Sequence, residues 1–340
     1  MSRHHITTKG AVRNVLVITM ASLLLASCAQ AAASLSAMGQ PSLSLAAPLT
    51  TLACTSTGAC IALGASGGAT APTSAGQVRN HKGAWSALNL PPAPIAFLND
   101  AACGASTCLV GGTRSGVDLV WSINTSDGAV SALAGPAGGL VVHNLSCPID
   151  GHCSLIDQGA HGLLRFIATS NTGSTWGAAH LLNWAVDKTT RLDCPGVSHC
   201  FVATTSITHH VTLRETVDGG TTWRLIATPA PWTSLDTLSC TLTCVALVSD
   251  ASGSAVASQV KGVWTLTRLS FSASSLACTS PTACLVVGHD AHDNATMAMW
   301  QGRAVHDVAL SYVPTALDHV ACAPAVCVAS GVTTVVSLRP

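Results

Sequence analysis

Fourteen of the fifteen cysteines in this 340-residue chain fall into seven close pairs, a spacing that suits either disulfide bonds or metal binding. Tetrahedral zinc sites use CxxC pairs with a second pair or histidines, and c-type haem uses CxxCH, but neither motif occurs here. Disulfides between near neighbours are therefore favoured, provided that the cysteines lie outside the cytoplasm. The pairs are Cys54 and Cys60, Cys103 and Cys108, Cys147 and Cys153, Cys194 and Cys200, Cys240 and Cys244, Cys278 and Cys284, and Cys322 and Cys327.

The N-terminal segment indicates where the cysteines are. Arg3, Lys9 and Arg13 precede a mostly apolar run that ends at Leu25, as in a signal peptide. The run continues into Leu-Ala-Ser-Cys, which resembles the lipobox of bacterial lipoproteins, so Cys28 is the expected lipid-modified first residue of the mature protein. A plain secretory signal with a chance cysteine is the alternative. In either case export supplies the oxidising environment in which seven local disulfides form.

The histidines are the other residues with metal-binding chemistry, and there are fourteen of them. The stretch His289-Asp290-Ala291-His292-Asp293 has the look of a short metal site. Solvated loop residues, in a chain with few lysines and one glutamate, are the simpler interpretation, and no cofactor is expected. The metal candidates in predicted loops are His161, His209, His210, His289 and His292.

The spacing of the cysteine pairs predicts the elements that position these residues. First cysteines of successive pairs lie 49, 44, 47, 46, 38 and 44 residues apart, which is the period of a four-stranded propeller blade. An apolar or alternating run enters the first cysteine and a second leaves the next, as in residues 235–240 and 244–248. The sequence therefore predicts an all-β, seven-bladed β-propeller whose four-stranded blades are each stapled by a local disulfide.

The most specific motif is the turn at residues 216–223, Thr-Val-Asp-Gly-Gly-Thr-Thr-Trp, which matches the Asp-box pattern S/T-x-D-x-G-x-T-W. The motif begins at Thr216. We expect Asp218 to accept backbone N–H bonds within the turn, Gly220 to take a φ that other residues resist, and Trp223 to bury its ring between blades.

A second copy at residues 169–176 has Asn171 in place of the aspartate and retains Gly173 and Trp176. Both copies begin sixteen residues after the second cysteine of their pair, so they should occupy one structural position. Residues 125–128 are a degenerate third copy.

With these boxes the chain resembles the bacterial Asp-box (BNR) repeat propellers, which include sialidases and exported propellers of the photosystem II assembly-factor type. The resemblance implies that the disulfide hairpins and the boxes share one face. It also implies that the connections on the opposite face carry function.

The ends of the chain must close such a ring. The last repeat reaches Pro340 without a fourth strand, whereas residues 42–46 alternate polar and apolar and belong to no blade. We expect residues 42–46 to supply the missing outer strand. The expected organisation is a signal peptide over residues 1–27, a tether over 28–41 and the propeller over 42–340.

Composition and site residues argue against several functions. Formal charge is zero and only 9% of residues are charged, so no nucleic-acid partner is expected, and the membrane is met only through the lipid anchor.

The sialidase resemblance implies a Tyr nucleophile, a Glu, an Asp and three arginines, but Tyr312 and Glu215 are the only residues of their kinds. Trp184 and Trp232 could stack on a sugar, although packing between blades is favoured. Aspartates for a two-carboxylate glycosidase would come from Asp157, Asp187, Asp250, Asp290 and Asp318.

We therefore expect a non-catalytic binding or assembly propeller at the cell envelope, with an envelope protein or glycan as its partner. The alternatives are a carbohydrate-active hydrolase of the sialidase-like type and metal binding by the loop histidines. Two or three carboxylates with arginines at the mouth of the central channel would favour the enzyme, and an apolar or mixed surface would favour binding.

Overall fold

The chain is described by a computed structural model. The predicted signal peptide, Cys28 and residues 42–46 lie outside the described residues and stay predictions. Within the described part of the chain no helix is long and apolar enough to cross a membrane. The described residues are 36–37, 48–66, 73–91, 97–185, 188–229, 232–241, 243–310, 316–332 and 335–339.

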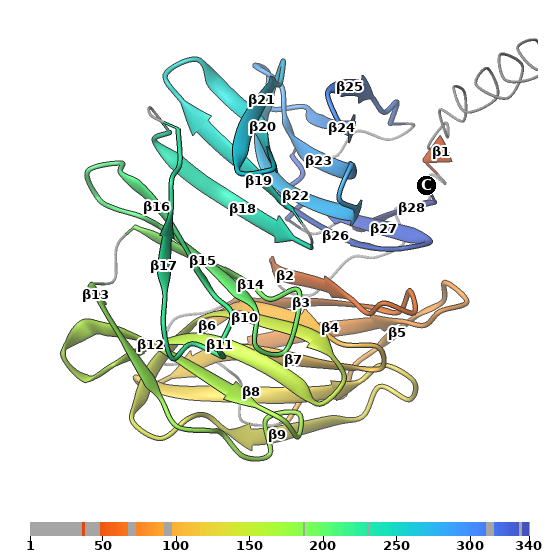
Figure 1. The fold of residues 1–340 in the computed structure, drawn as a ribbon. Coiled ribbons are helices and arrows are strands. Elements are labelled where there is room, and N and C mark those ends of the chain that lie inside the picture. The colour runs from red at the N-terminus through yellow and green to blue at the C-terminus, as the bar shows by residue number, and fades with distance from the viewer. Residues whose placement is uncertain are drawn as a thin grey trace, which may run out of the picture. The chain divides into compact units, whose positions relative to one another are not determined.

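Seven antiparallel four-stranded sheets follow one another along the chain, and in the first six of them the strands keep sequence order (Figure 1). Blade 1 holds β2 (Leu49–Cys54), β3 (Cys60–Ser66), β4 (Thr73–Arg79) and β5 (Trp85–Ala87). Blade 2 holds β6 (Phe97–Cys103), β7 (Thr107–Arg114), β8 (Val117–Asn124) and β9 (Val130–Ala134). Blade 3 holds β10 (Gly139–Ile149), β11 (His152–Gly159), the 3-10 turn η1 (Ala160–Gly162), β12 (Leu163–Thr169) and β13 (His180–Ala185).

The remaining blades repeat this arrangement. Blade 4 holds β14 (Thr189–Asp193), β15 (Cys200–Thr205), β16 (Val211–Thr216) and β17 (Arg224–Ile226). Blade 5 holds β18 (Ser234–Cys240), β19 (Cys244–Asp250), β20 (Gly253–Val260) and β21 (Val263–Arg268). Blade 6 holds β22 (Ser272–Ser280), β23 (Ala283–His289), β24 (Ala295–Gln301) and β25 (Ala304–Asp307). Blade 7 holds β26 (His319–Ala323), β27 (Val326–Ser330), β28 (Val335–Arg339) and β1 (Ser36–Ala37).

The first strands of the blades form a closed ring in which each contacts the next, and β26 of blade 7 contacts β2 of blade 1. The apolar cores lie between blades, so the second strand of a blade is covered on both faces and is buried along its length, as in β15 and β27. Trp121 and Trp300 are the largest fully buried side chains. The structure thus confirms the predicted all-β seven-bladed propeller.

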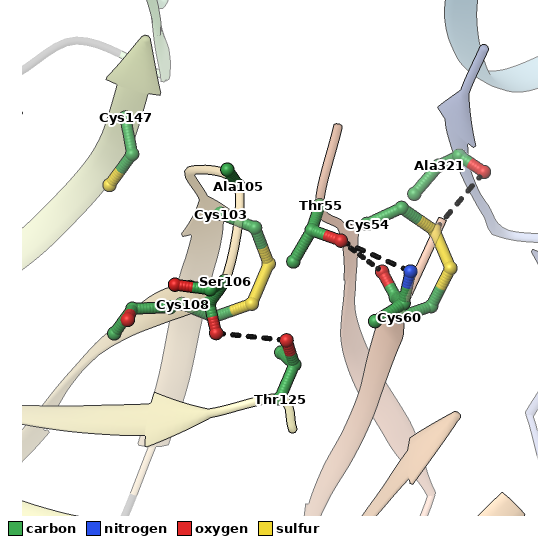
Figure 2. The surroundings of a disulfide bond; sticks show 12 residues. Cys54, Thr55, Cys60, Cys103, Ala105, Ser106, Cys108, Thr125, Cys147 and Ala321 are labelled. Atoms are coloured by element: carbon green, nitrogen blue, oxygen red, sulfur yellow. Dashed lines mark hydrogen bonds between the residues drawn. A yellow bond between two sulfur atoms is a disulfide. The ribbon is translucent and has the colours of Figure 1, made fainter. Parts of the chain in front are cut away.

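All seven cysteine pairs form the predicted disulfides, each joining the end of a blade's first strand to the start of its second. Cα atoms of each pair lie 3.9–4.1 Å apart, and Cys54 and Cys60 are register partners in the sheet. Figure 2 shows the bridges of blades 1 and 2, with the Thr125 hydroxyl donating to the Ser106 carbonyl at 2.8 Å. The third-to-fourth-strand turn of blade 2 therefore lies on the same face as its disulfide hairpin, as predicted.

The ring closes through the N-terminal side of the chain, but at a different place from the one expected. β1 pairs antiparallel with β28, with Ser36 opposite Arg339 and Ala37 opposite Leu338. The fourth strand of blade 7 thus comes from within the segment expected to be a free tether, upstream of residues 42–46. A two-residue strand carries no alternating pattern and could not be recognised from the sequence, whereas residues 42–46 do alternate.

The turn at 216–223 is held as its composition predicted. The Asp218 carboxylate accepts from the Thr216 hydroxyl at 2.8 Å, the Thr222 amide at 2.9 Å and the Thr222 hydroxyl at 2.6 Å. Gly220 has a φ of +89°, and a Cβ there would lie 2.3 Å from the Phe166 ring, so only glycine fits. Trp223 packs edge-on against Phe166 and Trp184 of blade 3.

The turn at 169–176 repeats this geometry in blade 3. The Asn171 Oδ1 accepts from the Thr175 amide at 2.9 Å, and its Nδ2 donates to the Thr175 hydroxyl at 2.7 Å. Gly173 has a φ of +79°, and the Trp176 indole donates to the Ala134 carbonyl of blade 2 at 3.1 Å. In both turns the leading threonine is the register partner of the second cysteine, which explains the shared spacing of sixteen.

Candidate functional site

Two faces of the ring differ in regularity. We call the side with the disulfide hairpins and the third-to-fourth-strand turns the disulfide face. The opposite side, made by the second-to-third-strand connections and the connections between blades, is the connection face. Bonds such as Thr172 N to Gly151 O and Gly219 N to Ser198 O tie the turns of the disulfide face together within a blade. The disulfide face is therefore similar in these blades, and the candidate places for the functional site are the connection face and the central channel, where the blades differ.

The candidate histidines lie on the connection face, in blades 3, 4 and 6, as predicted, but they are not brought together. No three His, Cys, Asp or Glu side chains among the described residues are close enough to hold a metal ion. The His289 Nε2 lies 3.9 Å from the Asp293 carboxylate of the same connection. The Asp290 carboxylate accepts the backbone amides of His292 and Asn294, so the stretch is a closed turn whose acidic group is already used.

A cavity of about 310 Å³ occupies the central channel and is lined by the first strands of all seven blades. The lining follows the cysteine register, because the residue three positions before each first cysteine faces this cavity or its wall. That position is polar in every blade. Its occupants, from blade 1 to blade 7, are Thr51, Asp100, Asn144, Arg191, Thr237, Ser275 and His319.

The polar ring has a structural reason. A first strand has no partner on its channel side, so its amides need acceptors from elsewhere. The Asp100 carboxylate accepts the Leu145 amide at 2.7 Å, and the Ser275 hydroxyl accepts the Val320 amide at 3.3 Å. In each case the acceptor belongs to one blade and the amide to the next. Side chains at this position therefore fasten neighbouring blades around the channel.

Arg191 departs from that role, because a guanidinium cannot accept a hydrogen bond. Its Nε donates to the Asp236 carbonyl at 2.5 Å and its Nη1 to the Thr190 carbonyl at 2.8 Å. Asp100, Asp236 and Asp318 also line the cavity, together with one arginine, Arg191. The number of carboxylates thus fits the criterion set for an enzyme, whereas that criterion also called for more than one arginine. Its lining is mixed in charge and mostly polar.

Near the connection face, blades 2 and 3 enclose a buried carboxyl pair. Asp118 is 2% exposed and Asp157 is fully buried, and Arg165 binds Asp157 through Nε at 2.8 Å and Nη2 at 2.5 Å. Burial and the neighbouring Asp157 raise the pKa of Asp118 to about 8. Burial thus favours the protonated form of Asp118, whose two carboxyl oxygens have no hydrogen-bond partner among the described residues. Gly139 covers the pair so closely that a Cβ would lie 1.9 Å from Asp118.

The other named side chains have structural surroundings. Trp184 packs against Trp223, with the Arg214 guanidinium carbon 4.0 Å from its ring, and Trp232 packs edge-on against Trp264, so both tryptophans fill blade interfaces as favoured. Glu215 binds His199 at 2.8 Å and also Arg224.

Of the candidate aspartates, Asp318 lines the channel, Asp157 is in the buried pair, and Asp250 binds Arg268. Tyr312 and Asp187 lie outside the described residues. Sequence reasoning missed Asp100, Arg191 and Asp118. Asp100 and Arg191 each lie three positions before the first cysteine of their blade, and this repeated position could have identified them as residues of the channel wall.

The comparisons with known proteins add the fold and no more. YCF48 from Cyanidioschyzon merolae superposes on 91% of this chain and 99% of its own, with a TM-score of 0.61 and 9% identity. A structure of YCF48 bound to D1 peptide covers 90% of this chain and 94% of its own, with a TM-score of 0.62 and 14% identity. A GH74 xyloglucanase from Xanthomonas campestris covers 90% of this chain and 53% of its own, with a TM-score of 0.64 and 11% identity. No protein-family model matches the sequence, and no curated protein is detectably similar to it.

Proposed function

We propose that this protein is a non-catalytic binding or assembly factor that holds a protein partner against its connection face. The observation that carries the proposal is the exposure of large apolar side chains at the connection-face ends of strands in blades 2 and 3, where Phe97, Val117 and Leu140 are 57%, 58% and 41% exposed. Exposed large apolar side chains that gather on a soluble protein mark contact sites for other proteins. The structure of YCF48 bound to D1 peptide supports the idea, since it is a propeller of this fold with a bound peptide.

The three exposed apolar residues belong to blades 2 and 3. Phe97 is the register partner of Thr113, whose hydroxyl donates to the Leu140 carbonyl at 3.5 Å. Val117 opens the next strand opposite Arg114, so its side chain is on the other side of blade 2 from Phe97. All three apolar residues sit at the connection-face ends of their strands. Each is outside the blade-to-blade cores, so the fold gives no packing reason for these side chains.

We place this protein outside the cytoplasm, anchored by Cys28 to the outer surface of a bacterial membrane or cell envelope. Seven disulfides are typical of an oxidising compartment and support export. The Leu-Ala-Ser-Cys sequence at the end of the apolar run supports the anchor. The box-like turns at 169–176 and 216–223 support kinship with the Asp-box repeat propellers.

A carbohydrate-active hydrolase is the second candidate, favoured by the three aspartates of the channel. Two of them are already engaged by the protein itself. Asp100 accepts the Leu145 amide, and Asp236 accepts the Ser234 hydroxyl at 2.9 Å. A glycosidase needs one free carboxylic acid and one free carboxylate placed across the scissile bond. Because Asp100 and Asp236 are engaged by the protein itself, the channel does not offer the two free carboxyl groups that a glycosidase needs, and binding is the better proposal.

Site-specific photo-crosslinking in the producing cell tests the proposal. A photoreactive phenylalanine analogue at Phe97 should give an adduct with a discrete envelope protein, and Phe97→Ser should abolish co-purification of that protein. The control position is Val217, which is 65% exposed on the disulfide face and should give no such adduct. An adduct from position 217 alone would place the partner on the wrong face. Hydrolysis of xyloglucan or sialyl oligosaccharides without any adduct would favour the enzyme.

A further inference from the structure

The disulfide face carries large apolar side chains at the tips of its turns. Two of them lie within disulfide loops, one follows the leading threonine of the turn at 216–223, and two flank the third-to-fourth-strand turn of blade 5. All belong to the consecutive blades 3, 4 and 5. They are Ile149, Val197, Val217, Val260 and Val263, which are 51%, 48%, 65%, 57% and 65% exposed.

The turns hold these side chains in a fixed place. The Gly219 amide donates to the Ser198 carbonyl at 2.9 Å, which joins the two apolar turns of blade 4. The two valines of blade 5 are register partners, so their side chains lie on the same side of the sheet. Lys261 and Gly262 between them have positive φ, as in a tight two-residue hairpin turn. All five apolar side chains are too exposed to belong to a blade-to-blade core, so packing within the fold does not account for them.

Charged neighbours limit how deeply these tips can be buried in another phase. Lys261 lies between the two valines of blade 5, Asp218 follows Val217, and both charged residues are exposed. A charged side chain is costly in the hydrocarbon core of a bilayer, whereas the headgroup layer accepts apolar and charged groups side by side. The tips therefore suit a shallow contact with lipid headgroups.

The N-terminal side of the chain joins the ring at the same face. Leu338 is the register partner of both Cys327 and Ala37, so Ser36 lies at the disulfide-face end of blade 7, beside β28 (Figure 1). Seven residues separate Ser36 from Cys28, and a chain of that length reaches at most about 28 Å. The five residues of β28 alone span about 15 Å toward the connection face. A lipid on Cys28 would therefore keep the disulfide face close to the membrane and the connection face farther from it.

We propose that the disulfide face lies on the membrane surface, with the apolar turn tips of blades 3, 4 and 5 seated in the lipid headgroup layer. This inference rests on the lipid anchor at Cys28 proposed above. Blade 7 contacts blades 6 and 1, so blades 3 and 4 are across the ring from the point where the tether joins. Contacts on both sides of the ring hold this face along the bilayer and turn the connection face toward the partner. The tips act because the anchor keeps them near the surface, and without it they bind too weakly to hold the protein there.

Quenching by brominated lipid tests the proposal on the acylated protein reconstituted in phosphatidylcholine vesicles. A fluorescent amino acid is placed at position 263 or, as the matched control, at position 117, because Val117 is similarly exposed but belongs to the connection face. We expect brominated phosphatidylcholine to quench position 263 and to leave position 117 unquenched. With a reporter at position 217, the double variant Val260→Ser and Val263→Ser should lose quenching because apolar contact area is removed, whereas Val117→Ser should retain it.

The possible outcomes separate this inference from the anchor on which it rests. Acylated, vesicle-bound protein that is quenched at neither position would overturn the inference and leave the anchor standing. Quenching at position 117 alone would overturn it by reversing the orientation. A shielded position 263 that brominated lipid does not quench, in protein with the mass of a dimer, would assign the tips to a second copy and overturn it too. Protein that carries no lipid at Cys28 would overturn both the anchor and this inference.

Discussion

At the scale of single residues, aspartates in this chain perform opposite electrostatic roles. Asp218 lies in an exposed turn, where hydrogen bonds led by the Thr222 hydroxyl lower its pKa to about 2. Asp118 lies in the blade 2–3 interface, where burial and Asp157 raise its pKa to about 8. The role of Asp218 was readable from the sequence because its partners are within four residues. The role of Asp118 was not, because Asp157 and Arg165 come from the next blade.

The raised pKa of Asp118 predicts that stability falls as the pH rises from about 4 to about 8. Its folded pKa of about 8 lies above the unfolded value near 3.9, so the unfolded chain binds fewer protons between those values. The contribution of Asp118 is complete below about pH 4 and falls by at most about 1.4 kcal/mol per pH unit up to about pH 8. Asp118→Asn should remove this slope, because an amide does not ionise. Melting temperatures of both proteins across that range would measure it, and parallel curves would contradict it.

Asp218 predicts the opposite dependence. Its folded pKa lies below the unfolded value, so its contribution is present above about pH 4 and is lost as the pH falls toward about 2. Asp218→Ala should lower the melting temperature at neutral pH and converge with the wild type in acid. Asp218→Asn should be milder, because Asn171 already makes the equivalent bonds. Asp127→Ala is the control, since the Asp127 carboxylate accepts the Ala129 amide at 2.9 Å in the degenerate turn of blade 2. If Asp127→Ala lowers the melting temperature as much as Asp218→Ala does, the hydrogen bonds of the turn at 216–223 do not stabilise the protein more than those of an ordinary turn.

At the scale of elements, the repeat made most of the fold predictable. Cysteine spacing located the first hairpin of every blade, and the tryptophan turns located the fourth strands of blades 3 and 4. The closing strand was placed wrongly because Ser36–Ala37 pairs with β28 through its backbone. Two residues are too few to show the alternation of polar and apolar side chains by which a strand is recognised in a sequence. The ring therefore reaches into the expected tether.

Truncation tests where the ring closes. Deleting residues 29–40 removes β1 and exposes the backbone edge of β28, so we expect a lower melting temperature and greater aggregation. Deleting residues 29–35 alone leaves Ser36–Ala37 in place and should change neither. Light scattering on heating reports the aggregation. Identical behaviour of the two truncations would show that β1 does not close the ring.

At the scale of the whole molecule, seven disulfides form a circle of covalent links on one face, each local to its blade. Because no bridge joins two blades, the ring depends on the apolar interfaces and on side chains such as Asp100 and Ser275 that fasten one first strand to the next. Only the links within blades could be predicted from the sequence, and not the contacts between blades. The local bridges followed from spacing, whereas the channel contacts needed the ring to be closed in space.

Oxidation state follows from that arrangement. The mature protein should weigh fourteen hydrogens less than its all-thiol form, with every pair linked within itself in a peptide map. Each short loop contributes about 2 kcal/mol by the chain-entropy model, so loss of one pair, as in Cys278→Ala with Cys284→Ala, should lower stability without opening the ring. Links between blades, or several free thiols, would be incompatible with the fold described.

The last prediction concerns how the propeller is held at the envelope. If Cys28 carries the lipid, Cys28→Ala should remove acylation and move the protein from the detergent phase to the aqueous phase. The reason is that the lipid is the expected membrane attachment, since the apolar run from residue 15 to residue 25 is too short to serve as a membrane span. The variant should keep the wild-type melting temperature, since Cys28 precedes β1 and takes no part in any of the seven disulfides. Ser27→Ala, which leaves the cysteine in place, is the matched control and should still be acylated. Lipid labelling that persists in Cys28→Ala would show that the attachment is elsewhere, and the segment would then be a plain secretory signal.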